Sequence, residues 1–155
     1  MENFVEKVLH ASGFEKLNPV QELALQKGLL EGKNLVVAAP TASGKTLIAE
    51  IAFLKCISEK RKAVYIVPLR ALANEKYQEF CKKYPEIKIA LSIGDYDSAD
   101  PWLADYDLII ATSEKLDSLL RHGAPWIQDI GLIIADEIHL LNSPERGPTL
   151  EVVLT

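Results

Sequence analysis

The sequence has few cysteines, few aromatic residues and no long apolar run. Cys56 and Cys81 are its only cysteines, and they do not form a C-x-x-C pair. This excludes a disulfide-rich scaffold and a cysteine zinc site, so we expect two reduced cysteines that pack in helices. No apolar run approaches the roughly 18 residues of a membrane span, and the first residues show no signal-peptide pattern. We therefore expect a soluble, cytoplasmic protein with no membrane partner.

The sequence also lacks an excess of basic residues. It has 17 Lys and Arg against 22 Asp and Glu, a formal net charge of −5. A free-standing nucleic-acid-binding domain is more often basic, so any contact with nucleic acid must be local. Internal repeats, low-complexity tracts and interdomain linkers are absent too. What remains is a chain of 155 residues, 48% hydrophobic, which is enough for one domain with a real core.

Short apolar runs alternate with segments of helical periodicity. The runs predict strands at residues 35–38, 63–67, 88–93, 107–111 and 131–135. Helices are expected at residues 2–11, 19–30, after 46, 68–84, 112–119 and 147–155, with one helical turn at 101–105. This alternation indicates an α/β fold with a mostly parallel sheet and helices on both faces. We expect N-terminal helices at 1–33 and the sheet domain at 34–155.

Residues 34–50 have the order strand, loop, helix, with small residues where the backbone must curl. Such a loop points consecutive N–H groups, and the positive end of the helix dipole, at a phosphate. Ala39 stands where the usual G-x-x-x-x-G-K-[ST] pattern has glycine, and the alternative is an ordinary strand-to-helix turn. Lys45 would reach the terminal phosphates of ATP and Thr46 would hold Mg²⁺. The loop residues that would bind ATP are Pro40, Thr41, Ala42, Ser43, Gly44, Lys45 and Thr46.

Two further segments fit the same nucleotide. Asp136 and Glu137 directly follow an apolar strand. We assign Asp136 to Mg²⁺, and Glu137 to the water that attacks the γ-phosphate. Gln21 lies at the mouth of a predicted helix, and its amide both donates and accepts, so it can read the edge of adenine. His139 follows the two carboxylates closely, which favours a functional role over a structural one.

Nucleic-acid contacts are expected where further strands end, because ligands bind beyond the carboxyl ends of parallel strands. Pro68 and Arg70, Gly94-Asp95, and the Thr112-Ser-Glu-Lys115 segment occupy those positions. Backbone N–H groups at helix starts, with Arg70 and a threonine hydroxyl, can hold successive phosphates without reading bases. The alternative for each segment is a solvated cap or turn. Trp102 and Trp126 could stack on bases, but we expect both to pack.

Four of these segments, in this order and spacing, resemble a known family. They are APTASGKT at 39–46, PLRALANEK at 68–76, TSEKLDSL at 112–119 and DEIHLL at 136–141. The chain resembles the first motor domain of superfamily-two helicases, most closely the superkiller-like branch. Within that branch it resembles the archaeal Hjm-type DNA helicases, relatives of the DNA polymerase theta helicase domain. The segment RGPTLE at 146–151 also fits this branch.

The resemblance implies a RecA-like P-loop domain in which Gln21 reads adenine and His139 links the ATP state to the rest of the motor. It implies ATP hydrolysis coupled to 3′-to-5′ movement on single-stranded or forked DNA, in replication-fork repair. An archaeal protein of this kind would be associated with the nucleoid.

The chain departs from the family's pattern where it stops, at Thr155. The S-A-T strand, the second RecA-like domain and the later DNA-binding domains would follow, so we expect a fragment with a vacancy beside the phosphate loop. We expect it to bind Mg·ATP and to hydrolyse it poorly. The alternatives are an RNA helicase of the same branch and a non-catalytic module that binds a nucleotide or nucleic acid.

Overall fold

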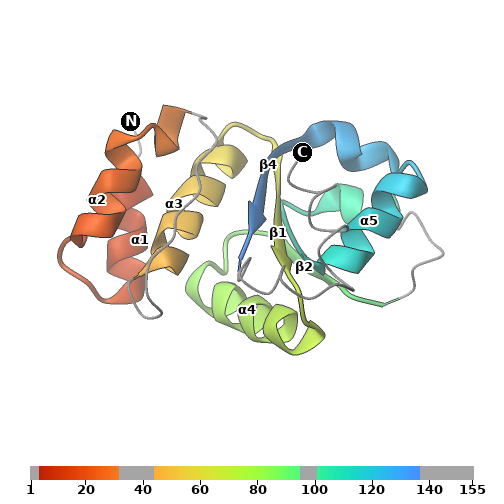
Figure 1. Cartoon of the computed structure of the whole chain (residues 1–155), viewed down its shortest axis with the longest axis horizontal. Helices are drawn as coiled ribbons and strands as arrows, with labels where there is room; N and C mark the ends of the chain where they lie inside the picture. The colour runs from red at the N-terminus through yellow and green to blue at the C-terminus, as the bar shows by residue number, and fades with distance from the viewer. Residues whose placement is uncertain (1–3, 32–43, 95–100, 137–155) are drawn as a thin grey trace. The chain divides into compact units, whose positions relative to one another are not determined.

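The computed structural model describes residues 4–31, 44–94 and 101–136, which belong to two compact units (Figure 1). The first unit comprises residues 1–59 and the second residues 60–155. The strand predicted at 35–38 and the helix predicted at 147–155 lie outside the described residues. No helix in the described ranges is both long and apolar enough to cross a membrane.

The described residues of the first unit, 4–31 and 44–59, form helices and their connections. Its elements are α1 (Phe4–Ser12), α2 (Pro19–Gln26), the 3₁₀ helix η1 (Leu29–Glu31) and α3 (Lys45–Ser58). The elements α1, α2 and η1 each contact α3. The helix predicted at 19–30 is wrong in one respect, because the chain leaves the α-helix after Gln26. Gly28 has a φ of +102° there, a left-handed conformation that ends a helix and suits glycine.

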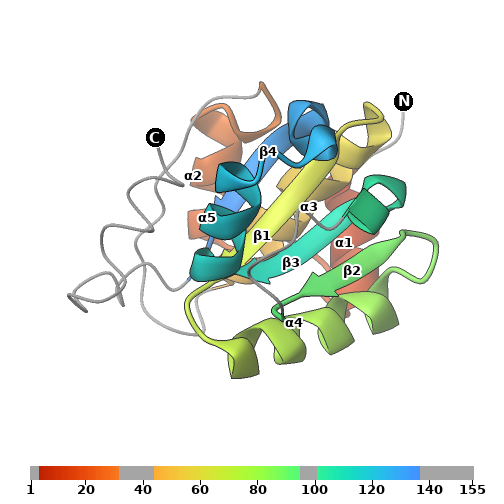
Figure 2. The ribbon, with the colours of Figure 1, turned by 90° about the vertical axis from the view of Figure 1, so that its right-hand side faces the viewer.

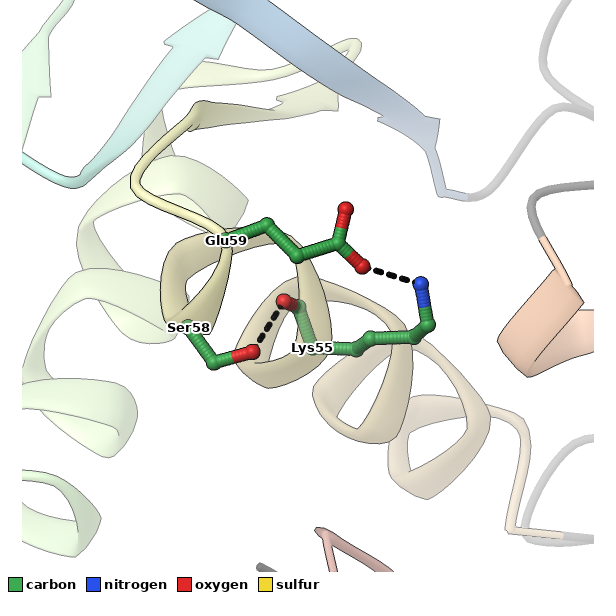
Figure 3. A network of polar contacts seen from close by, with 3 residues as sticks. All are labelled: Lys55, Ser58 and Glu59. Carbon is green, nitrogen blue, oxygen red and sulfur yellow. Dashed lines mark hydrogen bonds and ion pairs between the residues drawn. The ribbon is translucent and has the colours of Figure 1, made fainter. Parts of the chain in front are cut away.

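A short polar network closes the last turn of α3 (Figure 3). Lys55 pairs with Glu59 one turn later, and the Ser58 hydroxyl donates to the Lys55 carbonyl at 2.6 Å. The contacts are exposed to solvent, so they contribute little to stability. The Ser58 hydroxyl gives the Lys55 carbonyl a second donor beside the Glu59 N–H, which donates to it at 3.2 Å.

The second unit is built on a parallel four-stranded sheet. Its strands are β1 (Lys62–Val67), β2 (Ile89–Ser92), β3 (Leu108–Thr112) and β4 (Ile130–Ala135), in the order β2-β3-β1-β4. All three pairings are parallel, and Val67 at the end of β1 lies opposite Thr112 at the end of β3. Four of the predicted strands are therefore confirmed. Residues that follow them, including Pro68 and Asp136, share one edge of the sheet.

Helices cover both faces of this sheet (Figure 2). The two α-helices are α4 (Arg70–Lys83) and α5 (Ser113–Arg121), with the 3₁₀ helices η2 (Pro101–Asp105) and η3 (Pro125–Asp129). Side chains alternate along β1: Tyr65 meets Phe80 of α4, and Val64 and Ile66 share a buried cluster with Leu116 of α5. The full cluster is Val64, Ile66, Ala90, Leu103, Ile109, Leu116, Leu119, Ala124 and Trp126. The predicted α/β fold, with helices on both faces of a parallel sheet, is confirmed.

Candidate functional site

The start of α3 carries the described end of the phosphate loop. Gly44 caps the helix in a left-handed conformation (φ +82°), and Lys45 and Thr46 are its first two residues. The N–H groups of a first helical turn have no intrahelical partner and favour an anion. Residues 40–43 of the predicted loop lie outside the described part of the chain. A left-handed glycine at a helix start is compatible with the predicted phosphate loop, and phosphate binding stays a prediction.

Gln21 connects the start of α2 to this glycine. Its side-chain oxygen accepts from the Asn18 N–H at 2.9 Å, and the Asn18 side chain accepts from the Gln21 N–H at 2.9 Å, which makes a capping box. Its Nε2 donates to the Gly44 carbonyl at 3.0 Å. With 4% exposure, the Gln21 amide is largely engaged inside the protein. It holds the phosphate-loop glycine, and adenine reading stays a prediction.

The same packing explains why position 44 is glycine. A Cβ at Gly44 would meet Gln21 Nε2 and would stand 2.9 Å from Asn18 Nδ2. The positive φ adds backbone strain for any other L-residue. Glycine is therefore favoured at position 44 for two reasons: the positive φ, and the close approach of the Asn18 and Gln21 side chains at the start of α2.

We expect Gln21→Ala to lower the free energy of unfolding by about 1–3 kcal/mol, because the half-buried Asn18 N–H and Gly44 carbonyl each lose a hydrogen bond with a net value of about 0.5–1.5 kcal/mol. The affinity for ATP should fall as well, since Gly44 is no longer held. Urea denaturation and calorimetric ATP titration measure the two effects. Glu22→Ala, the exposed neighbour on α2, is the control: it should leave ATP affinity unchanged and should cost no more than about 0.3–1 kcal/mol of stability, the contribution of an acidic residue in a first helical turn. Wild-type stability and affinity in Gln21→Ala would contradict the role of the amide.

Asp136 is anchored twice to β1. Its N–H donates to the Ile66 carbonyl at 2.9 Å, which extends the parallel ladder by one residue beyond β4. Its Oδ2 accepts a hydrogen bond of 2.5 Å from the Tyr65 hydroxyl. The carboxylate thus stands at the carboxyl edge of the sheet, where the sequence predicts it. Glu137 and His139 lie outside the described residues, and their roles stay predictions.

The donors at these two positions fit Mg²⁺ by their chemistry. Mg²⁺ prefers oxygen ligands and is usually held by one or two carboxylates together with phosphates and waters. Asp136 offers a carboxylate and Thr46 a hydroxyl. Among the described residues no three His, Cys, Asp or Glu gather into a metal cluster. Lys45 and Thr46 belong to the first unit and Asp136 to the second, so their convergence on one nucleotide also stays a prediction.

The candidate nucleic-acid contacts differ in exposure. Arg70 is exposed at the first position of α4, whereas Pro68 is buried. Thr112 caps α5, since its hydroxyl accepts from the Lys115 N–H at 3.3 Å. The side chains of Thr112 and Lys115 are each 1% exposed, so neither presents its polar end to solvent. Sequence reasoning placed these two residues correctly on the helix start but did not foresee their burial.

The two tryptophans also differ in exposure. Trp126 is 1% exposed within the core cluster, which confirms that it packs. Trp102 is 49% exposed, with its ring edge-on to Tyr106 at 5.6 Å, so its predicted packing is confirmed only in part. Cys56 lies in α3 and is buried, and Cys81 lies in α4 and is half-buried, so both lie in helices as predicted.

Sequence reasoning missed Tyr65 and Asn18. Tyr65 stands in the apolar run AVYIV, where it was counted as one more strand residue. The available signal was its hydroxyl, since a tyrosine in a fully buried strand needs a hydrogen-bond partner. Asn18 precedes Pro19 and has Gln three residues later, the spacing of a capping box.

Comparison with known proteins gives one family and a consistent set of relatives. The sequence model of the DEAD/DEAH box helicases matches residues 18–155. The chain is 56% identical to "ATP-dependent DNA helicase Hel308" of Thermococcus kodakarensis over 153 residues, which is 97% of this chain and 14% of that protein. It is 56% identical to the protein of the same name from Pyrococcus abyssi over 154 residues, 97% of this chain and 21% of the relative.

Solved structures agree on the fold. A hypothetical ATP-dependent RNA helicase from Sulfolobus tokodaii superposes with a TM-score of 0.76 at 23% identity, covering 99% of this chain and 46% of that one. The DUF1998 helicase MrfA superposes with a TM-score of 0.75 at 27% identity, covering 91% of this chain and 24% of that one. At such identities the first likeness supports the fold alone. The chain spans between a seventh and about a fifth of the length of the two Hel308 relatives.

Proposed function

Because the chain belongs to the DEAD/DEAH box helicase family, we propose that it is the ATP-binding part of an ATP-dependent DNA helicase that moves 3′ to 5′ on single-stranded DNA. The observation that carries this proposal is the 56% identity to two ATP-dependent DNA helicases over 97% of the chain. Forked DNA at damaged replication forks would be the substrate of the whole protein, in the cytoplasm and on the nucleoid if it is archaeal. The proposed division is N-terminal helices at 1–33 and the RecA-like domain at 34–155.

The proposal gives each nucleotide-site residue a task. Residues 40–46 bind the phosphates through backbone N–H groups and Lys45, and Gln21 holds Gly44 and contacts adenine. Thr46 and Asp136 would hold Mg²⁺, which would neutralise the charge that develops during phosphoryl transfer. Glu137 orients and deprotonates the attacking water, and His139 links the nucleotide state to the rest of the motor.

Contacts with the DNA backbone are proposed at the starts of α4 and α5. Arg70 is exposed there and supplies a cation, and α4 and α5 each begin shortly after the carboxyl end of a strand. Thr112 and Lys115 remain proposed contacts, but both residues are 1% exposed and the Lys115 N–H donates to the Thr112 hydroxyl, so Arg70 is the better supported of the three. Phosphate contacts position the strand without reading bases.

We expect the chain to bind Mg·ATP but to hydrolyse it slowly. An arginine finger contributes about 10³–10⁵ in rate in related phosphoryl-transfer enzymes. In this proposal the finger belongs to a second RecA-like domain, and residues 1–155 supply only the first. Steady-state phosphate release with and without single-stranded DNA measures this. Robust DNA-stimulated turnover by residues 1–155 would contradict it.

Binding experiments on residues 1–155 distinguish the proposed DNA-helicase domain from a non-catalytic binding module and from an RNA helicase. Calorimetric titration with ATP, followed by DNA binding with and without ATP, distinguishes a motor domain from a non-catalytic module. Nucleic-acid binding that is indifferent to ATP would favour the module. Tighter binding of single-stranded RNA than of DNA of matched sequence would favour an RNA helicase of the same branch.

A further inference from the structure

A fully buried tyrosine holds the carboxylate that follows β4. Tyr65 is 0% exposed, on the central strand β1. Its hydroxyl donates to Asp136 Oδ2 at 2.5 Å, although the two residues are 71 positions apart in the chain. An O–H···O⁻ bond of this length is charge-assisted, about twice as strong as a neutral hydrogen bond. The contact joins the interior of the sheet to the edge where ligands bind.

The sheet itself sets up this contact. Tyr65 pairs with Ile134 across the parallel β1–β4 ladder, so Asp136, two residues later, emerges on the same face of the sheet. The Asp136 N–H is held by the carbonyl of Ile66, the residue after Tyr65. The backbone and the side chain of Asp136 are therefore both hydrogen-bonded to β1, and this restricts rotation of its carboxylate.

The ring of Tyr65 is fixed from the other side. Phe80 of α4 meets it in an edge-to-face arrangement, with ring centroids 5.3 Å apart and an interplanar angle of 69°. Phe80 is itself 0% exposed. A tyrosine has two side-chain torsions, so packing of its ring determines where its hydroxyl stands. The position of the hydroxyl thus depends on α4, and the position of the carboxylate depends on the hydroxyl.

We propose that Tyr65 is a positioning residue for the metal–nucleotide site: its hydroxyl orients the Asp136 carboxylate toward Mg²⁺. This inference rests on the proposed function, in which Asp136 holds the metal. Partners that orient a metal-ligating group typically contribute about 10–100-fold to metal affinity. A tyrosine that served only to fill the core would contribute to folding and nothing to metal dependence.

The test is Tyr65→Phe in the full chain, which removes the hydroxyl and keeps the ring against Phe80. ATP affinity is measured by calorimetry in Mg²⁺ and in EDTA. The dissociation constant in EDTA divided by that in Mg²⁺, called the metal ratio here, reports how much the metal strengthens ATP binding. We expect this ratio to fall about 10-fold or more, with ATP affinity in EDTA unchanged. Direct Mn²⁺ titration in the presence of ATP, followed by electron paramagnetic resonance, should show the same loss.

Two variants make the result specific. Tyr84→Phe removes the hydroxyl of another tyrosine that is 1% exposed, and it should leave the metal ratio unchanged. Asp136→Asn should lower the ratio at least as far as Tyr65→Phe, and adding Tyr65→Phe to it should have no further effect. Additive losses in the double variant, or a wild-type ratio in Tyr65→Phe, would overturn the positioning role.

The outcomes separate the two proposals. A normal ratio in Asp136→Asn would contradict the metal role of Asp136, and with it both the proposed function and this inference. A reduced ratio in Asp136→Asn but not in Tyr65→Phe would contradict this inference alone. If Tyr65→Phe does not fold, Phe80→Leu carries the test, because it frees the ring and retains the hydroxyl. A metal ratio equal to wild type in a folded Phe80→Leu would then overturn the inference.

Discussion

Replacing Lys45 by alanine is expected to weaken ATP binding by about 30-fold to several thousand-fold. Removing one partner of a desolvated charge pair costs about 2–5 kcal/mol, and each ~1.4 kcal/mol is a factor of ten. Lys45 is the first residue of α3, directly after the left-handed Gly44. The triphosphate would lose its ammonium partner while the N–H groups of the turn remain. Calorimetric titration with Mg·ATP measures the loss.

The free energy of unfolding of Lys45→Ala should rise slightly or stay unchanged, although ATP binding is weakened. A cation in the first turn of a helix opposes the helix dipole, so Lys45→Ala removes an unfavourable interaction of about 0.3–1 kcal/mol. Lys55→Ala is the matched control, because Lys55 lies on the same helix and forms an exposed pair with Glu59. It should leave ATP affinity unchanged. Equal affinities for wild type and Lys45→Ala, with both folded, would refute a phosphate site at the start of α3.

Trp126→Ala is expected to lower the free energy of unfolding by about 3–5 kcal/mol, the usual cost of truncating a buried Trp to Ala. Trp126 is 1% exposed and belongs to the cluster between the sheet and α5, next to Leu116 and Leu119. Removing the indole leaves a cavity that β-strand and helix backbones cannot close. Urea denaturation monitored by circular dichroism measures the change.

The second tryptophan supplies the comparison. Trp102 is 49% exposed and makes one edge-to-face contact with Tyr106, so Trp102→Ala should cost about 0.5–1.5 kcal/mol. DNA binding by the folded fraction should be insensitive to Trp126→Ala, since a packed ring cannot stack on a base. A small stability loss with a large loss of DNA affinity in Trp126→Ala would reverse this assignment.

Local patterns were sufficient for the strands and for several element boundaries. The runs at 63–67, 88–93, 107–111 and 131–135 are largely apolar, which is typical of strands in a parallel sheet. The strands β1 and β3 are buried along their whole length, whereas β4 is partly exposed. The helical turn expected at 101–105 is the 3₁₀ helix Pro101–Asp105. The helix predicted at 19–30 is too long, because hydrophobic periodicity does not show that Gly28 takes a positive φ and ends the α-helix.

The roles of single polar residues were harder to predict. Gln21 is predicted to read adenine, and that role stays a prediction. The sequence did not indicate that its amide also accepts from the Asn18 N–H and donates to the Gly44 carbonyl. Lys115 matched a phosphate contact, and its side chain is buried. A side chain's partners come from segments distant in the chain, and neither spacing nor residue type specifies which of them will be within hydrogen-bond distance.

The order of residues along the chain decided the alternation of strands and helices, the glycine turn before Lys45, and the carboxylate directly after an apolar strand. These features depend on near neighbours, through backbone conformation and hydrophobic periodicity. Strand order, the two faces of the sheet, and the meeting of Tyr65 with Asp136 were decided by folding. The physical reason is that pairing β1 with β4 brings together groups 71 residues apart, and the chain between them carries no local trace of that contact.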